Sequence, residues 1–326
     1  SRGRPGSRIF VMDDIVEHSR RTIEKGSKSF AAAARIFDPA TRASAYMLYA
    51  WCRHCDDQTD GQDLGWGAEK LPAAAARSRL DGLQAETERA LAGEPVEDPI
   101  FAGLQYVVDR HEIPHRYPRE HLEGFSMDVE GREYIGIEDT IRYCYHVAGV
   151  VGVMMAYIMG VRENDALNRA TDLGLAFQLT NIARDVMEDA GVGRVYLPTQ
   201  FLLAEGVPVG HIEAREHRAA VFHVARRLLD EADRYYASAV VGLSSLSFRS
   251  AWAVATAKEV YQDIGRVIRS RGAAAWDSRA STSTSRKLAL AARGLRSTIR
   301  SRIVPVSVSR DGLWTRPESI TAPPVA

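Results

Sequence analysis

The segment 173–189 constrains the fold most, because apolar residues cover most of the helix that its spacing predicts. Asn181, Asp185 and Asp189 recur at every fourth position and therefore share one face of that helix. A helix that is apolar nearly all round is buried, and polar groups on it need partners. Buried carboxylates repel one another unless cations lie between them. The segment therefore predicts a buried helix with a metal-binding stripe.

A second acidic stripe precedes the first in the chain. Asp56 and Asp60 are one helical turn apart, and Arg53 and Tyr49 continue their face toward the N-terminus. Such a carboxylate pair alone is usually a solvated helix end. It also suits Mg²⁺, whose octahedral shell accepts one or two carboxylates together with water or phosphate oxygens. Two stripes on separate helices predict a cavity with several magnesium ions between its walls.

Fixed positive charge is expected at the same rim, from Arg53, Arg184 and Arg194. Divalent cations together with guanidinium groups suit a polyanion, most simply a diphosphate. The deeper walls are expected to be apolar and aromatic, so the substrate should carry a large hydrocarbon. Phe30 and Phe177 could stabilise positive charge there, or could be ordinary core residues. A prenyl diphosphate satisfies both ends of such a site.

Helical periodicity dominates the chain, and runs of alternating β-branched residues are absent. We therefore predict an all-α helical bundle around a central apolar cavity. It would form one domain over residues 13–302, after a flexible segment 1–12 and before a poorly ordered, proline-containing tail 303–326. A glycine-rich loop is expected at 61–72. The helices are predicted at 13–26, 41–60, 73–91, 98–111, 119–130, 140–159, 164–188, 211–238 and 250–270.

The segment 143–161 has 19 residues without a formal charge, which is long enough for a membrane span. It contains His146 and three glycines, and Arg142 and Arg162 flank it symmetrically, so a buried central helix is favoured. Its small residues, including Gly149 and Gly152, could leave room for hydrocarbon tails or could allow close helix packing.

Charge and cysteine content exclude several classes of protein. Lys plus Arg and Asp plus Glu both number 42, which argues against a dedicated nucleic-acid binder. The segment 266–310 nevertheless carries eleven basic residues and one acid, so it either docks on anionic lipid or is a solvated surface. Three cysteines indicate a reducing compartment, and no second Cys pair completes a zinc site with Cys52 and Cys55. No glycine-rich dinucleotide or P-loop motif occurs.

Several blocks of this sequence resemble motifs of the squalene and phytoene synthase family. Their residues are most similar to those of the bacterial phytoene synthases. The likeness is strongest over residues 173–198, where every fixed position of one family signature is matched. Residues 143–152, 27–30 and 46–57 resemble its other motifs. One departure is Gln58 and Thr59, which stand where the family usually has apolar residues. They lie between the expected ligands, so metal binding should be retained.

The resemblance implies an all-α isoprenoid-synthase fold and head-to-head condensation of two geranylgeranyl diphosphates to phytoene, through prephytoene diphosphate. It implies Mg²⁺, with Mn²⁺ as a substitute, and no NAD(P)H. The implied metal ligands are Asp56, Asp60, Asn181, Asp185 and Asp189. The implied catalytic residues are Tyr49, Arg53, Arg184, Arg194, Tyr196 and Tyr261. The implied substrate contacts, which include the turn 26–29, are Ser27, Ser29, Phe30, Phe177 and Gln178.

Two alternatives remain at this stage. A squalene or dehydrosqualene synthase acting on farnesyl diphosphate would have nearly the same site and would differ in cavity depth. A non-catalytic relative acting as an assembly factor would be expected to lose acidic ligands, and both stripes are intact. The expected partners are geranylgeranyl diphosphate, a membrane surface and other carotenoid-pathway enzymes, with no nucleic acid. The expected location is the cytoplasm, with the inner face of the cell membrane as the docking surface.

Overall fold

The computed structural model describes residues 12–26, 28–60, 72–278 and 283–317, without the side chains of residues 28, 29, 60 and 284. These ranges contain helices and connecting turns, and no strand occurs within them. The α-helices are α1 (Met12–Gly26), α2 (Lys28–Ala34), α3 (Pro39–Asp60), α4 (Ala73–Leu91), α5 (Pro99–His111), α6 (Arg116–Val129), α7 (Ile137–Cys144), α8 (Val150–Ile158), α9 (Asn164–Gly191), α10 (Thr199–Ala204), α11 (Arg218–Val241), α12 (Phe248–Arg271) and α13 (Thr284–Ile303).

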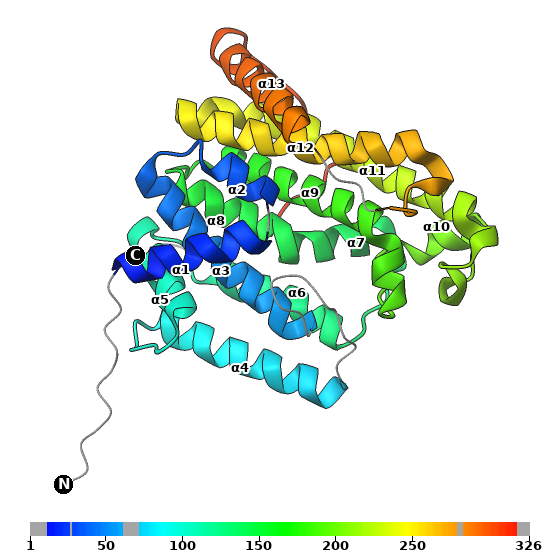
Figure 1. Cartoon of the computed structure of the whole chain (residues 1–326), viewed down its shortest axis with the longest axis horizontal. Helices are drawn as coiled ribbons and strands as arrows, with labels where there is room; N and C mark the ends of the chain where they lie inside the picture. Colours follow the sequence, from blue (N-terminus) through cyan, green and yellow to red (C-terminus); the bar gives the residue numbers. More distant parts are fainter. Residues whose placement is uncertain (1–11, 27, 61–71, 279–282, 318–326) are drawn as a thin grey trace, which may run out of the picture.

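The predicted buried helix is α9, which lies in the middle of the bundle (Figure 1). Helices α8, α11 and α12 pack around it, while α4 and α13 lie at opposite sides of the molecule. Leu175, Leu179 and Ala183 of α9 are completely buried. The apolar pattern that predicted burial therefore gives α9 its central place, since each of its apolar faces meets a neighbouring helix.

The apolar segment after α7 is a core helix. A π-helical turn, Tyr145–Gly149, joins α7 to α8 in one continuous rod. Among the described helices, Ile137–Ile158 alone is long and apolar enough to cross a membrane. More than half of its most apolar window is buried inside the protein, with Val150, Val153 and Met154 in the core. The apolar composition of residues 143–161 is therefore explained by burial in the core, which is the alternative that the sequence favoured over a membrane span.

Several element boundaries differ from the sequence prediction. Helix α3 begins at Pro39, not at residue 41, because Asp38 caps it by accepting hydrogen bonds from the backbone N–H groups of Ala40 and Thr41 at 3.1 and 3.0 Å. Proline fits the first helical position because its missing N–H is not needed there. Helices α10 and α13 were not predicted, and α11 begins at Arg218, seven residues later than expected. The glycine-rich loop 61–72 lies, apart from Pro72, outside the described residues.

Part of the tail that was expected to be poorly ordered is fixed in the structure. Beyond α13, Arg310 forms two hydrogen bonds with the fully buried carboxylate of Asp172, at 2.8 and 2.7 Å. Arg316 is also buried, and it donates a 2.9 Å hydrogen bond to the hydroxyl of Tyr117. Sequence patterns do not reveal these contacts, because their partners are 138 and 199 residues away in the chain. Residues 318–326 lie outside the described part.

Candidate functional site

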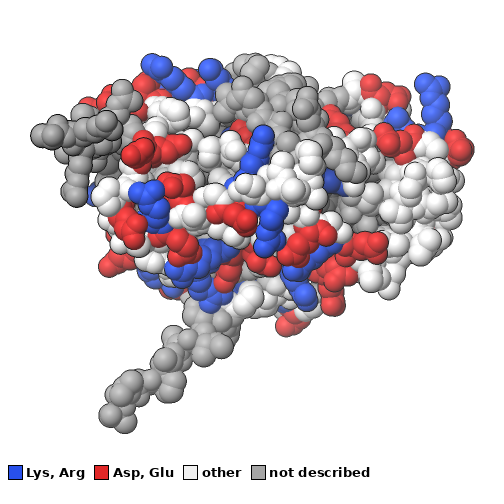
Figure 2. All heavy atoms as spheres, turned by 90° about the horizontal axis from the view of Figure 1, so that it is seen from below, with Lys and Arg blue, Asp and Glu red and all other residues white. Residues whose placement is uncertain are grey.

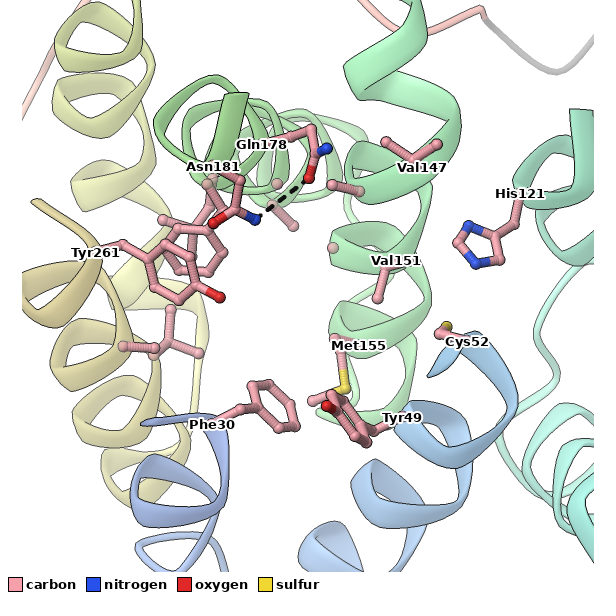
Figure 3. A pocket seen from close by; sticks show the side chains of 18 of the residues that line it. Phe30, Tyr49, Cys52, His121, Val147, Val151, Met155, Gln178, Asn181 and Tyr261 are labelled. Carbon is pink, nitrogen blue, oxygen red and sulfur yellow. Dashed lines mark hydrogen bonds between the residues drawn. The ribbon is translucent and has the colours of Figure 1, made fainter. Parts of the chain in front are cut away.

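A cavity of about 910 Å³ runs through the bundle beside α9. Its walls come from α2, α3, α6, α8, α9, α11 and α12, as the side chains in Figure 3 illustrate. The residues of α9 that line it extend from Ala166 to Gly191, a distance of about 38 Å at 1.5 Å per residue. The cavity is therefore long enough for an extended chain of many carbon atoms.

The two ends of this cavity differ in chemistry. Along the last turns of α9 the lining is polar and charged, with Gln178, Asn181 and Asp185. Along its first turns the lining is mostly apolar, with Ala166, Ala170 and Leu173. The guanidinium of Arg169 at this apolar end is already engaged, since it donates 2.9 Å hydrogen bonds to Ser238 and to the Val308 carbonyl.

Asn181 is the most informative side chain at the polar end. Its amide nitrogen donates to Oε1 of Gln178 at 3.4 Å, and both amides project from α9 (Figure 3). Its carbonyl oxygen, Oδ1, is buried and has no hydrogen-bond partner in the described part of the chain. An unsatisfied buried oxygen costs about 1–3 kcal/mol unless a bound group satisfies it. Oδ1 is therefore placed to accept a bond from a ligand or a cation.

Two arginine–aspartate pairs, one on α9 and one on α3, also line this cavity. On α9, Arg184 donates to Oδ1 of Asp185 at 2.7 Å. Burial by itself would lower the pKa of Arg184, but the hydrogen bond and charge of Asp185 outweigh burial and raise it. On α3, Arg53 bonds Asp56, and its Nε lies 3.3 Å from a carboxylate oxygen of Asp57. Both guanidiniums are thus paired with carboxylates at the cavity wall.

Stacked aromatic rings line the middle of the cavity. Phe30 of α2 stacks on Tyr49 of α3 with centroids 5.3 Å apart, and Phe177 of α9 stacks on Tyr261 of α12 at 4.2 Å. Figure 3 places Phe30 and Tyr49 together beside Met155, with Tyr261 on another wall. Burial raises the pKa of Tyr49 to about 12, so its hydroxyl stays neutral. These rings present π faces to the cavity from different walls.

The turn after α9 returns the chain to the cavity. Gly193 has φ +80°, and Arg194 N–H donates to the Asp189 carbonyl at 2.9 Å, a left-handed helix end that favours glycine. This reversal brings Arg194 and Tyr196 into the lining. The hydroxyl of Tyr196 donates to Asp128 at 3.0 Å. Tyr196 is therefore fixed at the wall through its own hydroxyl.

Every predicted site residue whose side chain is described lines this one cavity. The described members of the two stripes, the arginines and the aromatic residues thus share one cavity. Ser27 lies outside the described residues, and the side chains of Ser29 and Asp60 do so as well, although Ser29 belongs to α2 and not to the expected turn. Among the described His, Cys, Asp and Glu side chains, no three gather into a cluster that could hold a metal ion.

Sequence reasoning missed two lining residues. Glu188 lies seven residues after Asn181, and that spacing could have identified it as part of the same face. His121 of α6 is 2% exposed, and its Nε2 has no hydrogen-bond partner among the described residues (Figure 3). No local pattern indicates His121, because α6 reaches the cavity only through its packing against α3 and α8.

Known proteins similar to this chain agree with this geometry. The model of the squalene/phytoene synthase family matches residues 23–286. The 15-cis-phytoene synthase of Pantoea ananas is 51% identical over 93% of this chain and 98% of its own length. That of Paracoccus sp. (strain N81106 / MBIC 01143) is 50% identical over 94% of this chain and 99% of its own length.

Solved structures show the same fold. A dehydrosqualene synthase in complex with a ligand has a TM-score of 0.79 and 26% identity, over 89% of this chain and 98% of its own. The squalene synthase HpnC from Alicyclobacillus acidocaldarius, at 24% identity and a TM-score of 0.69, covers 80% of this chain and 95% of its own. The helical bundle is thus the architecture shared with these proteins.

Proposed function

The chain belongs to the squalene/phytoene synthase family, and from this premise we propose that it joins two geranylgeranyl diphosphates head to head to form phytoene. Relatives named phytoene synthase are about half identical to it over nearly their whole length, so it is a prenyl-transferring enzyme of that type. The observation that carries the substrate assignment is the cavity itself. Its charged end suits a diphosphate, and its long apolar end suits a prenyl chain.

Mg²⁺ is the cofactor that we propose, with Mn²⁺ as a substitute. The unsatisfied Oδ1 of Asn181 and the carboxylates of Asp185 and Asp189 are hard oxygen donors at one end of the cavity. Asp56 of α3 lines the same cavity, and Asp60 is the further proposed ligand on that helix. Two carboxylates per ion suffice, since Mg²⁺ takes its remaining ligands from water and phosphate. When bound, Mg²⁺ would neutralise the charge that develops on the departing diphosphate.

The protein's own contribution to the reaction is to bind the diphosphate through arginines and to exclude water from the cavity. Arg53, Arg184 and Arg194 hold the diphosphate and stabilise it as it leaves, which makes C1 of the donor an allylic cation. The acceptor's double bond attacks this carbon, and loss of a proton from the resulting cation closes the cyclopropane of prephytoene diphosphate. A second ionisation, rearrangement and proton loss give phytoene, so no reductant is needed. Water would capture these cations, and the apolar lining keeps it out.

The aromatic pairs are proposed to stabilise the cationic carbon. A ring face contributes about 0.5–2 kcal/mol to a nearby positive charge. Phe30 with Tyr49 and Phe177 with Tyr261 offer such faces from different walls. Tyr196 would act as a wall residue, because its hydroxyl is already bonded to Asp128.

Location and partners are proposed from the same chemistry. Substrate and product are largely hydrocarbon, so we propose a cytoplasmic enzyme that associates peripherally with the inner face of the membrane. Contacts with enzymes that consume phytoene would shorten its path through water. All the proposed site residues fall within the predicted domain 13–302.

Product analysis tests this function. The purified protein is incubated with geranylgeranyl or farnesyl diphosphate, with and without Mg²⁺ and NADPH, and the carbon number of the product is measured. A forty-carbon product from geranylgeranyl diphosphate without NADPH is expected. A preferred thirty-carbon product would assign squalene or dehydrosqualene synthesis instead, and no product under any condition would support a non-catalytic role.

A pair of variants tests whether α9 carries part of the proposed metal site. Asp185→Ala should lower turnover at least ~100-fold, because it removes a carboxylate at the charged end. Asp81→Ala on the exposed surface of α4 is the matched control and should leave turnover unchanged. Normal turnover by Asp185→Ala would remove α9 from the proposed metal site.

A further inference from the structure

Helix α13 exposes an apolar stripe that nothing in the described structure covers. Leu288, Ile299 and Ile303 are 71%, 44% and 73% exposed. With Ala292 they fall within about 60° of one another around the helix, at 100° per residue. Isolated exposed apolar residues are common, but an aligned set on one helix face usually marks an interaction surface.

The opposite face of α13 packs against α12, so the apolar stripe points away from the bundle. Leu290 and Thr298 are buried against α12. A Cβ at Gly294 would come within 2.8 Å of the Thr256 backbone nitrogen, so the two helices are in backbone contact there. Figure 1 shows α13 on the outer side of α12 at the edge of the molecule. The helix therefore cannot turn its apolar stripe toward the core.

The charge beside the stripe has one sign. Within Thr284–Ile303 there are six Lys and Arg residues and no Asp or Glu. Arg293, Arg296 and Arg300 are exposed along one side of the stripe and make no ion pair in the described part of the chain. The face seen from below the bundle is different, because acidic and basic residues alternate there (Figure 2). The partner of α13 is thus expected to be both anionic and apolar.

We propose that α13 docks the enzyme on an anionic lipid bilayer, with Leu288, Ile299 and Ile303 inserted between headgroups and the three arginines bound to phosphates. A narrow apolar stripe flanked by arginines is the pattern of helices that lie in the membrane interface. Each basic residue near an anionic surface adds to the affinity. A single bilayer satisfies both the charge and the apolar side chains at once.

The position of α13 connects this surface to the cavity. Gly242, Leu243 and Leu246 line the apolar end of the cavity, just before α12. Arg302 of α13 bonds the backbone carbonyls of Ser244 and Leu246, so α13 is attached to the segment that closes that end. Docking would therefore place the hydrocarbon end of the cavity beside the bilayer. This consequence, unlike lipid binding itself, rests on the proposed function.

Vesicle co-sedimentation of the full chain tests the proposal. Vesicles contain 30% phosphatidylglycerol in phosphatidylcholine, or phosphatidylcholine alone. The variants are Leu288→Gln/Ile299→Gln/Ile303→Gln and Arg293→Gln/Arg296→Gln/Arg300→Gln. Leu203→Gln/Ile135→Gln, at exposed apolar residues elsewhere, is the matched control. We expect the arginine variant to lose on the order of 100-fold in binding to the anionic vesicles. The apolar variant should lose at least tenfold, and the control should bind normally.

Turnover with detergent-dispersed geranylgeranyl diphosphate separates this proposal from the proposed function. Both α13 variants should retain it, because none of their residues lines the cavity. Unchanged vesicle binding by either variant, or equal binding of the wild type to neutral vesicles, would overturn the docking proposal and leave the enzymatic one standing. A wild-type dimer that both variants dissociate, with no vesicle binding, would assign the stripe to a second copy instead.

Discussion

Asn181 shows at the residue scale how a functional group can oppose stability. Its Oδ1 is buried without a partner in the described part of the protein, which is unfavourable until a ligand binds. Asn181→Leu removes that oxygen and keeps a similar volume. We expect turnover to fall on the order of 100-fold or more while the melting temperature stays equal or rises. Steady-state assays and thermal unfolding test this, and a lower melting temperature with normal turnover would contradict it.

His121 predicts a pH dependence of folding stability. Its Nδ1 lies 3.0 Å from the carbonyl oxygen of His146, so Nδ1 carries the proton and the ring is neutral. Burial lowers the pKa of His121 to about 4. The unfolded state binds a proton near pH 6.5, so the stabilising contribution is complete above that pH and is lost as the pH falls toward 4.

Urea unfolding at pH 7.5 and 5.0 measures this effect. His121 alone should account for about 2 kcal/mol of the stability lost between these pH values. His121→Met, which cannot titrate, should show a correspondingly smaller loss. His54, His111 and His146 also have pKa values lowered by burial, so the wild type as a whole should lose more. An equal loss in variant and wild type would show that His121 is accessible to protons in the folded state.

At the scale of elements, the contact between α8 and α9 decides the role of the small residues. The sequence left open whether Gly152 makes room for hydrocarbon or for a helix. A Cβ at Gly152 would lie 2.3 Å from the Ala170 carbonyl oxygen, and one at Gly174 would lie 2.4 Å from that of Ala148. These two glycines therefore allow the backbones of α8 and α9 to touch, which sets the wall of the cavity.

Gly152→Ala should consequently destabilise the protein by about 1–3 kcal/mol, because α8 and α9 must move apart. Turnover should fall as well, since α9 carries Asn181 and Asp185. Gly82→Ala on α4 is the matched control, because a Cβ there meets nothing within 4 Å. The control should be stabilised by roughly 0.5–1 kcal/mol, as expected for glycine in a helix. Chemical denaturation of both variants tests the difference, and equal effects would exclude the close contact.

Elements differ in how well the sequence predicts them. Helix α4 begins and ends at the predicted residues 73 and 91, since its pattern is local. Helix α13 was missed because its short apolar residues and many arginines resemble a solvated segment. Its N-terminal cap is Ser283, whose hydroxyl oxygen accepts a hydrogen bond from the Arg286 backbone N–H. The packing of α13 on α12 stabilises a helix whose own pattern is weak.

At the scale of the whole molecule, the described segment after α13, residues 304–317, is tied back to the central helix. Arg310 bonds Asp172 of α9, and Asp172 also accepts a hydrogen bond from Ser238 of α11 at 2.5 Å. The Trp314 backbone nitrogen donates to the Tyr235 hydroxyl at 3.1 Å. The segment that contains Arg310 and Trp314 thus joins α9 and α11 near the apolar end of the cavity.

Arg310→Ala should cost about 3–5 kcal/mol, because it leaves the buried Asp172 carboxylate without its cation. Asp172→Leu/Arg310→Met should recover much of that loss, since an apolar pair needs no charge compensation. Equilibrium unfolding of the single and double variants provides the test. A loss below about 1 kcal/mol in Arg310→Ala would show that the pair behaves as a solvated surface bridge.

The sequence by itself determined the helical class, the central burial of α9 and most of the described residues named here at the charged end of the cavity. These follow from periodicity and residue type, which are local properties of the chain. Only the tertiary structure decided that Gly152 serves helix contact, that His121 reaches the cavity, that α13 is a helix and that Arg310 neutralises Asp172. Each of these depends on which distant segments meet, and no local pattern records that, because burial and pairing are properties of the packed bundle.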